Sequence, residues 1–232
     1  MAQAMLRHSL ADFFRFLRAP QICAPAPLRN GRGRWAFMTG LYLAGLAMIG
    51  IGVTVWQRMF HLPAPEAFAG YSARMLVVIS LLIAPPCEEA LFRGWLTGRP
   101  RALWLLVLAL IAGLLLVAVT VHWHEMAAGF GFLAVVIAAP VGWYRLRRMD
   151  TPAWFARWFG AWFYLSAIVF GLMHLSNYPR LSWALVPMVL PQVWAALVFG
   201  YLRMRNGLWA GVLAHGMGNA AALALALMVS RG

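Results

Sequence analysis

Seven apolar segments occupy most of this chain, and no other feature of the sequence restricts its fold as strongly. Each is close to the roughly 20 residues that a helix needs to cross the hydrocarbon core of a bilayer. Hydrophobic residues make up 63% of the 232 positions. A soluble domain carries roughly 45–50%, so most of this chain has to face lipid. The segments span about 35–56, 73–98, 102–121, 127–144, 156–176, 181–202 and 206–229.

The fold class that follows is all-α. A segment in lipid has to satisfy its own backbone hydrogen bonds, and long apolar runs do this as helices. The alternating ten-residue strands of a membrane β-barrel are not visible in the sequence. We therefore predict a polytopic transmembrane bundle of about seven helices, preceded by an interfacial amphipathic helix over residues 5–18. The predicted apolar face of that first helix consists of Leu6, Leu10, Phe13, Phe14 and Leu17.

The predicted organisation is a cytoplasmic amphipathic helix and linker over residues 1–34, followed by one transmembrane domain over residues 35–232. Proline and glycine in "APAPLRNGRGR" favour a linker there. No cleavable signal peptide is expected, because a long polar leader precedes the first apolar run. Cys23 and Cys87 lie in different environments, so no disulfide is expected between them.

The placement of arginine predicts the orientation of the helices. All 19 basic residues are arginine, and the formal net charge is +13. With the N-terminus in the cytoplasm, 15 arginines fall on the inner side, and only Arg58, Arg74, Arg180 and Arg231 fall on the outer side. We therefore expect an integral protein of a bacterial inner (plasma) membrane, with a cytoplasmic N-terminus and an outer C-terminus. Because the arginines lie in short gaps between spans, nucleic acid is not an expected partner.

The second span contains three ionisable residues, Glu88, Glu89 and Arg93. Such residues are costly in a membrane and usually face a polar cavity. Glu89 and Arg93 are i,i+4 neighbours on a helix, whereas Glu88 points about 100° away from Glu89. Glu89 is thus expected to pair with Arg93, and Glu88 is then free to act as a general base. The alternative is that both glutamates and Arg93 form a buried network that only holds helices together. Pro85 and Pro86 are expected to open this helix locally and to make room near Glu88.

Two later spans carry further polar residues. His174 follows Phe170 by one turn, and a helix–helix hydrogen bond is its alternative role. His215 and Asn219 share one face in an i,i+4 pair. Small residues surround them, so a packing seam with Asn219 as polar glue is the alternative there.

Two other features near the spans have simpler interpretations. The stretch "HWHE", His122 to Glu125, lies in an outer loop, where surface solvation is favoured over metal binding. Cys87 adjoins the anion Glu88, and a thiol needs an electropositive setting to ionise. We therefore expect Cys87 to be a buried, inert residue rather than a nucleophile.

The polar residues of the three spans are the parts that peptide hydrolysis within a membrane requires. A glutamate and a histidine can activate a water molecule, and a histidine and an asparagine can donate hydrogen bonds to a developing oxyanion. A rise of about 1.5 Å per residue puts Glu88 and His215 at roughly 15 Å and 14 Å from the inner edge of their spans, but His174 at roughly 24 Å.

Three stretches, "EEALFRG", "FGLMH" and "HGMGN", resemble the EExxxR, FxxxH and HxxxN motifs of the CAAX protease and bacteriocin-processing (CPBP) family. Its members are membrane-embedded proteases related to the type II CAAX prenyl endopeptidase. The resemblance implies that Glu88 and His174 activate water and that His215 and Asn219 form the oxyanion hole. It gives supporting roles to Glu89, Arg93 and Phe170. No cofactor is expected in such a glutamate-type protease; zinc, bound by Glu88, His174 and His215, stays an alternative.

In one respect the chain departs from that family. The first two motifs usually lie a few tens of residues apart, but 80 residues separate Arg93 from His174 here. The gap holds two spans, and we expect residues 102–144 to form an inserted helical hairpin.

The predicted function is therefore intramembrane hydrolysis of a membrane-associated peptide or protein. A catalytically inactive membrane scaffold, a bacteriocin-immunity-type protein and a transporter are the alternatives.

Overall fold

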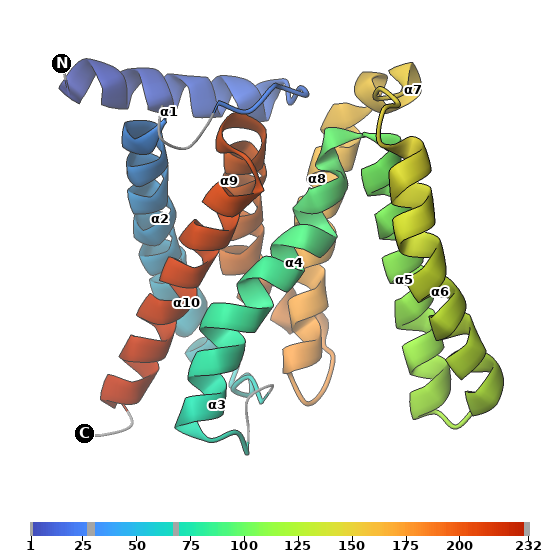
Figure 1. Ribbon diagram of the computed structural model, residues 1–232. Coiled ribbons are helices and arrows are strands. Elements are labelled where there is room, and N and C mark those ends of the chain that lie inside the picture. The colour runs from blue at the N-terminus through green and yellow to red at the C-terminus, as the bar shows by residue number, and fades with distance from the viewer. Residues whose placement is uncertain (1, 27–30, 67–69, 230–232) are drawn as a thin grey trace. The chain divides into compact units, whose positions relative to one another are not determined.

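The computed structural model describes residues 2–26, 31–66 and 70–229, and none of these residues forms a strand (Figure 1). The predicted all-α class is confirmed. Residues 27–30 of the predicted linker, and Arg231 of the outer arginines, lie outside the described residues. The helices are α1 (Ala2–Arg18), α2 (Arg32–Met59), α3 (Ala73–Val77), the π-helix η2 (Val78–Ile83), α4 (Ala84–Arg93), the 3₁₀ helix η3 (Gly94–Thr97), α5 (Pro100–Thr120), α6 (Glu125–Leu146), α7 (Ala153–Arg157), α8 (Phe159–Met173), the 3₁₀ helices η4 (His174–Asn177) and η5 (Trp183–Val189), α9 (Leu190–Asn206) and α10 (Leu208–Val229).

Seven helical segments of the described chain are long and apolar enough to cross a membrane, which confirms the predicted number. The chain is an integral membrane protein. The ends of the segments agree with the predicted spans to within a few residues. They are Arg32–Met59, Ala73–Thr97, Pro100–Thr120, Glu125–Leu146, Phe159–Asn177, Trp183–Asn206 and Leu208–Ala226.

The chain folds as two compact units. The first unit comprises Met1–Arg93 and Gly160–Gly232, and it contains all three sequence motifs. The second unit comprises Gly94–Phe159 and contains the predicted hairpin over residues 102–144. Every polar residue that the sequence analysis assigned to catalysis therefore lies within one unit.

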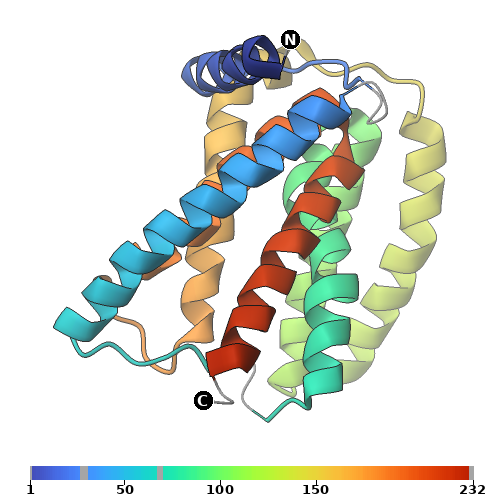
Figure 2. The same ribbon diagram turned by 90° about the vertical axis from the view of Figure 1, so that its left-hand side faces the viewer.

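α9 forms the centre of the first unit. It packs against α2 and α10, and α10 in turn packs against η2 and α4 (Figure 2). α9 belongs to the span Trp183–Asn206. In the apolar 18-residue stretch of this span, 56% is buried inside the protein, against at most 33% in the other described spans. The buried residues of α9 are Ala195, Ala196, Val198, Phe199, Gly200, Tyr201, Leu202, Met204 and Asn206.

α1 lies across the ends of α2 and α9 (Figure 1). Phe13 and Phe16 are buried against α9, with ring centroids 5.2 Å and 5.5 Å from that of Tyr201. Beside these rings, Asp12 accepts a hydrogen bond of 2.8 Å from the Tyr201 hydroxyl and one of 2.9 Å from Arg205. An apolar contact and an ion pair therefore hold α1 against the bundle.

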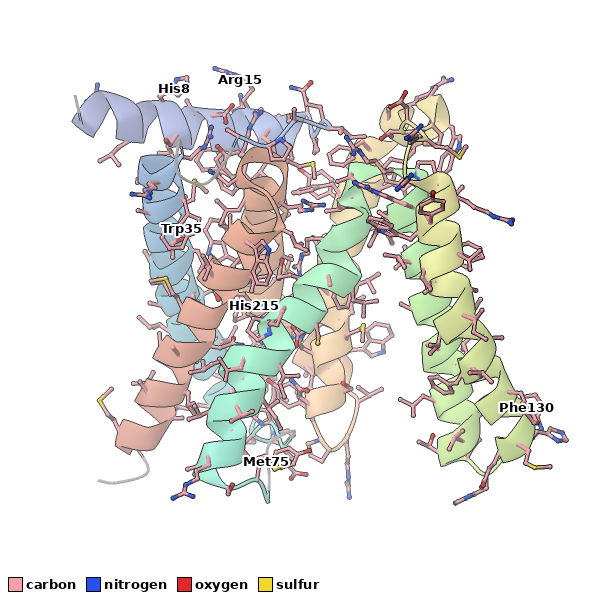
Figure 3. The ribbon with its side chains drawn as sticks, in the orientation of Figure 1. His8, Arg15, Trp35, Met75, Phe130 and His215 are labelled. Carbon is pink, nitrogen blue, oxygen red and sulfur yellow. The ribbon has the colours of Figure 1, made fainter. Side chains whose placement is uncertain are left out.

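The apolar face predicted for this first helix divides between the protein and its surroundings. Phe13 is 0% exposed, whereas the adjacent Phe14 is 52% exposed. Successive residues of a helix point about 100° apart, so only one of these two rings can face α9. On the outer side of α1, His8 and Arg15 point away from the bundle (Figure 3). Contacts with protein, and not the membrane interface alone, therefore fix the position of α1.

In the second unit, α5 and α6 pack as an antiparallel hairpin. The Trp104 indole donates a hydrogen bond of 3.1 Å to the carbonyl oxygen of Ala138. The same indole lies over Gly142, where an added Cβ would come within 2.1 Å of its nitrogen. Small residues of this kind let two membrane helices approach closely. In the connecting turn, His122 Nδ1 lies 2.5 Å from Glu125 Oε1, and both side chains are exposed.

Replacement of Phe13 by alanine tests the docking of α1. Loss of a fully buried phenylalanine leaves a cavity, so Phe13→Ala should lower the free energy of unfolding by about 3 kcal/mol. The adjacent Phe14→Ala is the matched control and should change it by less than about 0.5 kcal/mol. Denaturation of both purified variants in detergent measures the difference. Equal effects at the two positions would contradict the packing described for α1.

Candidate active site

The site begins where η2 passes into α4, at a break in the regular backbone hydrogen bonding. The N–H of Ala84 donates to the carbonyl oxygen of Ile79, five residues earlier, as in a π-helix. The carbonyl oxygen of Ser80 would then take its hydrogen bond from residue 85, but Pro85 has no N–H. Ser80 is thus left without a helical donor in either register. The Asn219 amide of α10 fills the vacancy with a hydrogen bond of 2.8 Å.

The expectation that the prolines open this helix holds for Pro85, which helps to free the carbonyl oxygen of Ser80; that oxygen fixes the side chain of Asn219. The room that the prolines were expected to make near Glu88 stays a prediction. An amide nitrogen carries two hydrogens, so one N–H of Asn219 stays available for another acceptor.

One helical turn further along α4, a buried network of charges joins α4 to α10. Glu89 Oε1 accepts hydrogen bonds from Arg93 Nη1 at 3.0 Å and from His215 Nδ1 at 3.1 Å. The side chains of Glu89 and Arg93 are 0% and 1% exposed. The predicted pairing of Glu89 with Arg93 is present. Gly211 of α10 makes room for it, since a Cβ there would lie 3.0 Å from Glu89 Oε2.

Aromatic rings surround the cations of this network. The Arg93 guanidinium lies 4.0 Å from the centroid of the Phe170 ring, and the rings of Phe92 and Phe199 are each 5.7 Å away. The imidazole of His215 stacks on Phe199 with centroids 5.1 Å apart. Ring faces attract cations, so this surrounding helps to keep a positive charge in an apolar interior.

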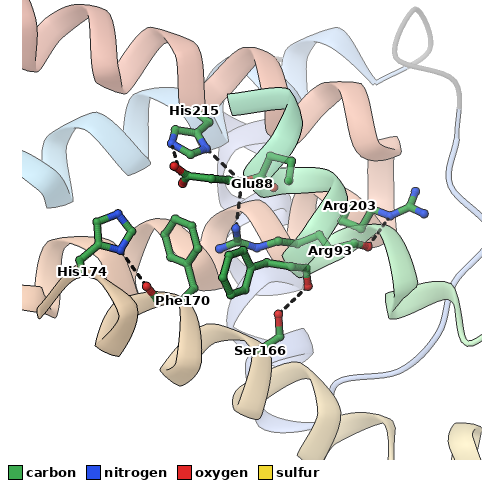
Figure 4. Close-up of polar contacts among 9 residues, drawn as sticks. Glu88, Arg93, Ser166, Phe170, His174, Arg203 and His215 are labelled. Atoms are coloured by element: carbon green, nitrogen blue, oxygen red, sulfur yellow. Dashed lines mark hydrogen bonds and ion pairs between the residues drawn. The ribbon is translucent and has the colours of Figure 1, made fainter. Parts of the chain in front are cut away.

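The carbonyl groups at the end of α4 are also satisfied by neighbouring helices (Figure 4). The Ser166 hydroxyl of α8 donates a hydrogen bond of 2.6 Å to the carbonyl oxygen of Phe92. The Arg203 guanidinium of α9 donates one of 3.0 Å to the carbonyl oxygen of Arg93. The last carbonyls of a helix lack helical partners. These two side chains therefore anchor α4 at the point where its charged residues face the bundle.

Glu88 differs from its neighbour in exposure and in its contacts, although Oε2 of each carboxylate lacks a hydrogen-bond partner in the described part of the chain. Its side chain is 33% exposed, and its Oε2 lies 3.8 Å from His215 Nε2, which is too long for a hydrogen bond. In the described part of the chain, Oε2 has no hydrogen-bond partner. One carboxylate of the adjacent pair is therefore committed to Arg93 and His215, and the other is still able to bind a further group.

His174 reaches the same region from the end of α8. It is the first residue of η4, and its Nδ1 lies 2.8 Å from the carbonyl oxygen of Phe170. The Phe170 ring has its centroid 4.9 Å from that of His174 and 6.1 Å from that of His215, so both histidines lie beside it (Figure 4). Within the described residues, no hydrogen bond or ion pair joins His174 to Glu88.

The residues proposed for zinc do not fit a metal site in this arrangement. Among the described residues, no group of three or more histidine, cysteine, aspartate or glutamate side chains is placed to hold a metal ion. Glu88 and His215 lie near each other, but His174 is directed to the carbonyl oxygen of Phe170.

The prediction that Cys87 is buried is wrong. Cys87 is exposed, and both cysteines are free. The buried residues of α4 are Pro85, Glu89, Phe92 and Arg93, which lie on one face. Residue 87 is two positions, or about 200°, from residue 89 and so lies on the opposite face.

Several residues at the site were not identified from the sequence. They are Tyr42 of α2, Ser80 of η2, Ser166 of α8, and Phe199 and Arg203 of α9. Tyr42, Ser80, Ser166 and Phe199 are ordinary residue types in a membrane helix, and Arg203 lies near the end of its span with other arginines, so composition gives no signal for any of them. In an α-helix Pro85 would leave the carbonyl of residue 81 unpaired; only the π-turn, which the sequence does not show, moves the loss to Ser80.

The fold and the site define a polytopic helical membrane protein with a buried polar centre. A model of one protein family, described as Rce1-like (type II CAAX prenyl endopeptidase Rce1-like), matches residues 70–221, which is more than half of the chain. The chain belongs to this family of CAAX-protease-type membrane endopeptidases, as its three motifs predicted. The matched segment excludes α1 and α2. Searches of curated proteins and of solved structures found no match.

Removal of Arg93 tests the buried network. Arg93→Ala leaves the Glu89 carboxylate buried without its cation, and we expect a loss of about 3–5 kcal/mol in the free energy of unfolding. The exposed Arg74 supplies the control, since Arg74→Ala should change stability by less than about 0.5 kcal/mol. Denaturation in detergent compares the two. A similar small change in both variants would show that the network adds no stability.

A double-mutant cycle tests the link between Pro85 and Asn219. Asn219→Ala should cost about 1–3 kcal/mol, because it leaves the Ser80 carbonyl unsatisfied. In a Pro85→Ala background the cost should fall by about 1 kcal/mol, because Ser80 regains a backbone donor. In the π register this donor is the new N–H at position 85; in the α register the new N–H donates to residue 81, and the N–H of Ala84 is released to donate to Ser80.

Pro86→Ala is the matched background for this cycle. It adds an N–H that reaches residue 82 or 81 but not residue 80. The cost of Asn219→Ala should therefore stay at its original value. The same cost in all three backgrounds would contradict the assignment of the Ser80 carbonyl as the partner that Pro85 exposes.

Proposed function

We propose that the chain is a glutamate-type intramembrane endopeptidase that hydrolyses a peptide bond of a membrane-associated peptide or protein. One observation carries the proposal. Of the two adjacent carboxylates, Glu89 is fully buried and accepts hydrogen bonds from Arg93 and His215 at Oε1, whereas Glu88 is 33% exposed beside His215 and forms no hydrogen bond with another side chain among the described residues. A carboxylate without a committed partner can accept a proton from water. Glu88 is therefore the general base of the proposed reaction.

His174 is the second group that would bind the attacking water. A carbonyl oxygen only accepts hydrogen bonds, so the contact with Phe170 requires that His174 Nδ1 carries a proton. In the neutral ring, Nε2 then has a free lone pair and can accept a hydrogen bond from water. Glu88 and His174 together would orient one water molecule toward the scissile carbonyl carbon.

His215 and Asn219 would stabilise the oxyanion. The contact with Glu89 places a proton on His215 Nδ1, and in the imidazolium form Nε2 also carries an N–H. Asn219 donates one amide N–H to Ser80 and retains the second. Donors that are held in place before the reaction stabilise a developing negative charge without reorganisation. The contacts to Glu89 and Ser80 would provide this orientation.

The proposed reaction proceeds in two steps. The water oxygen bonds to the carbonyl carbon, its proton passes to Glu88, and the electron pair of the C=O bond moves to the oxygen. The carbonyl bond then re-forms, the C–N bond breaks, and Glu88 returns the proton to the leaving nitrogen. The first product ends in a carboxyl group, and the second begins with an amine.

We also propose that the N-terminus lies in the cytoplasm and the C-terminus outside, in the inner membrane of a bacterium. The arginine distribution, in which 15 of 19 fall on the proposed inner side, supports this orientation, and the use of arginine at every basic position in place of lysine supports a bacterial source. α1, with its outward-facing Arg15, would lie on the cytoplasmic side.

Substitution of the base tests the function. Glu88→Gln is nearly isosteric and removes the basic oxygen, so cleavage should fall by at least about 100-fold while the protein still folds. Mass spectrometry of peptide termini can compare membranes from cells that carry either form at equal abundance. Termini present only with the wild type identify the substrate, and a peptide that spans the cleavage site then measures the rate in proteoliposomes.

Glu66→Gln is the matched control, since the side chain of Glu66 is exposed and Glu66 belongs to none of the three motifs. It should leave every terminus unchanged. Identical termini with the wild type and with Glu88→Gln would overturn the proposal, and a phenotype that survives Glu88→Gln would favour a non-catalytic scaffold.

A further inference from the structure

We propose that Tyr42 of α2 is a third hydrogen-bond donor of this active site, directed at the carbonyl oxygen of the scissile peptide bond. The inference rests on the proposed endopeptidase function and adds a residue to it. Tyr42 lies outside residues 70–221, the segment that matches the family, and it belongs to none of the three motifs. Its proposed role as a hydrogen-bond donor is inferred only from how its side chain packs in the structure.

The ring of Tyr42 is fixed with respect to His215. Tyr42 is 3% exposed, and its ring meets Phe199 edge-on with centroids 4.8 Å apart. Phe199 is the ring on which the His215 imidazole stacks. The backbone of Tyr42 is also held, because the Trp194 indole donates a hydrogen bond of 3.0 Å to its carbonyl oxygen. One aromatic ring therefore separates Tyr42 from the proposed oxyanion residue.

The hydroxyl of Tyr42 lies directly on α10, between the two residues proposed for the oxyanion hole. A Cβ at Gly218 would come within 2.0 Å of the hydroxyl oxygen, so only glycine permits this approach. Gly218 comes immediately before Asn219 and three residues after His215. Residues at i and i+3 share a helical face, so the hydroxyl lies on the face that carries His215.

No group in the described part of the chain forms a hydrogen bond with the Tyr42 hydroxyl, whereas the hydroxyl of Tyr201, a strongly buried tyrosine of α9, donates one to Asp12. Although Tyr42 is only 3% exposed, its hydroxyl oxygen is not among the fully buried unpaired atoms of the described residues, so a further group can reach it. A carbonyl oxygen of the substrate would be such a partner. The missing bond is thus explained if the site completes it only when substrate is bound.

The chemistry suits a neutral donor. When the water oxygen bonds to the carbonyl carbon, the electron pair of the C=O bond moves to the oxygen, and the Tyr42 O–H donates to it without giving up its proton. The hydrogen bond strengthens as the charge develops, which lowers the barrier rather than merely tightening substrate binding. Unlike His215, Tyr42 needs no added proton to act as a donor.

Tyr42→Phe tests the proposal, because it keeps the ring against Phe199 and removes only the hydroxyl. Since that hydroxyl has no partner in the protein, thermal stability in detergent should be unchanged or slightly higher. With the peptide identified through Glu88→Gln, kcat in proteoliposomes should fall by about 10- to 100-fold, with a much smaller change in KM. Tyr201→Phe is the matched control and should behave in the opposite way, with lower stability and unchanged kcat.

The outcomes separate this inference from the function on which it rests. Wild-type kcat in Tyr42→Phe, with cleavage still dependent on Glu88, would overturn the role of Tyr42 and leave the endopeptidase in place. A fall in stability together with cleavage would also overturn it, because the hydroxyl would then have a structural partner. An absence of Glu88-dependent cleavage in the wild type would overturn the endopeptidase itself, and the role of Tyr42 with it.

Discussion

The buried carboxylate of Glu89 is the group on which the rest of the site depends. A charge at 0% exposure in a membrane bundle requires a cation and further hydrogen bonds, and here Arg93 and His215 supply both. Arg93 lies one turn after Glu89 on α4, and His215 lies on α10. The need of the buried carboxylate for both partners therefore holds the two helices against each other. The aromatic rings of Phe92, Phe170 and Phe199 then close around Arg93. Glu88 can remain partly exposed because its neighbour forms these contacts.

Backbone irregularity contributes as much to the site as the charged side chains do. A regular helix through residues 78–90 would satisfy the Ser80 carbonyl internally and would leave nothing for Asn219 to bind. The π-turns and Pro85 together expose that carbonyl at the level where α10 passes. α10 in turn carries glycine at positions 211 and 218, where Glu89 and Tyr42 approach its backbone. The geometry thus depends on three backbone features: a missing N–H, a widened turn and two missing Cβ atoms.

The sequence predicted those parts of the structure that depend on a single helix. Hydropathy gave the seven spans, and i,i+4 spacing gave the contact of Glu89 with Arg93. Prediction from the sequence was less successful for features that depend on how two helices pack against each other. Phe13 and Phe14 are equally apolar, and only the position of α9 decides which of them is buried. Cys87 was wrongly placed for the same reason, since nothing in α4 alone shows which face meets lipid. The contacts of Tyr42 and Ser80 lie between segments more than 130 residues apart in sequence.

The two histidines illustrate why motif and geometry have to be combined. Counting along the spans placed His174 farther from the inner edge than Glu88 and His215, and in the structure it does lie at the end of α8. Its ring nevertheless meets the same phenylalanine as His215, because Phe170 is one turn earlier on its own helix. The ring of Phe170 is therefore the contact that brings His174 and His215 to the same region of the first unit, although the two histidines belong to different helices.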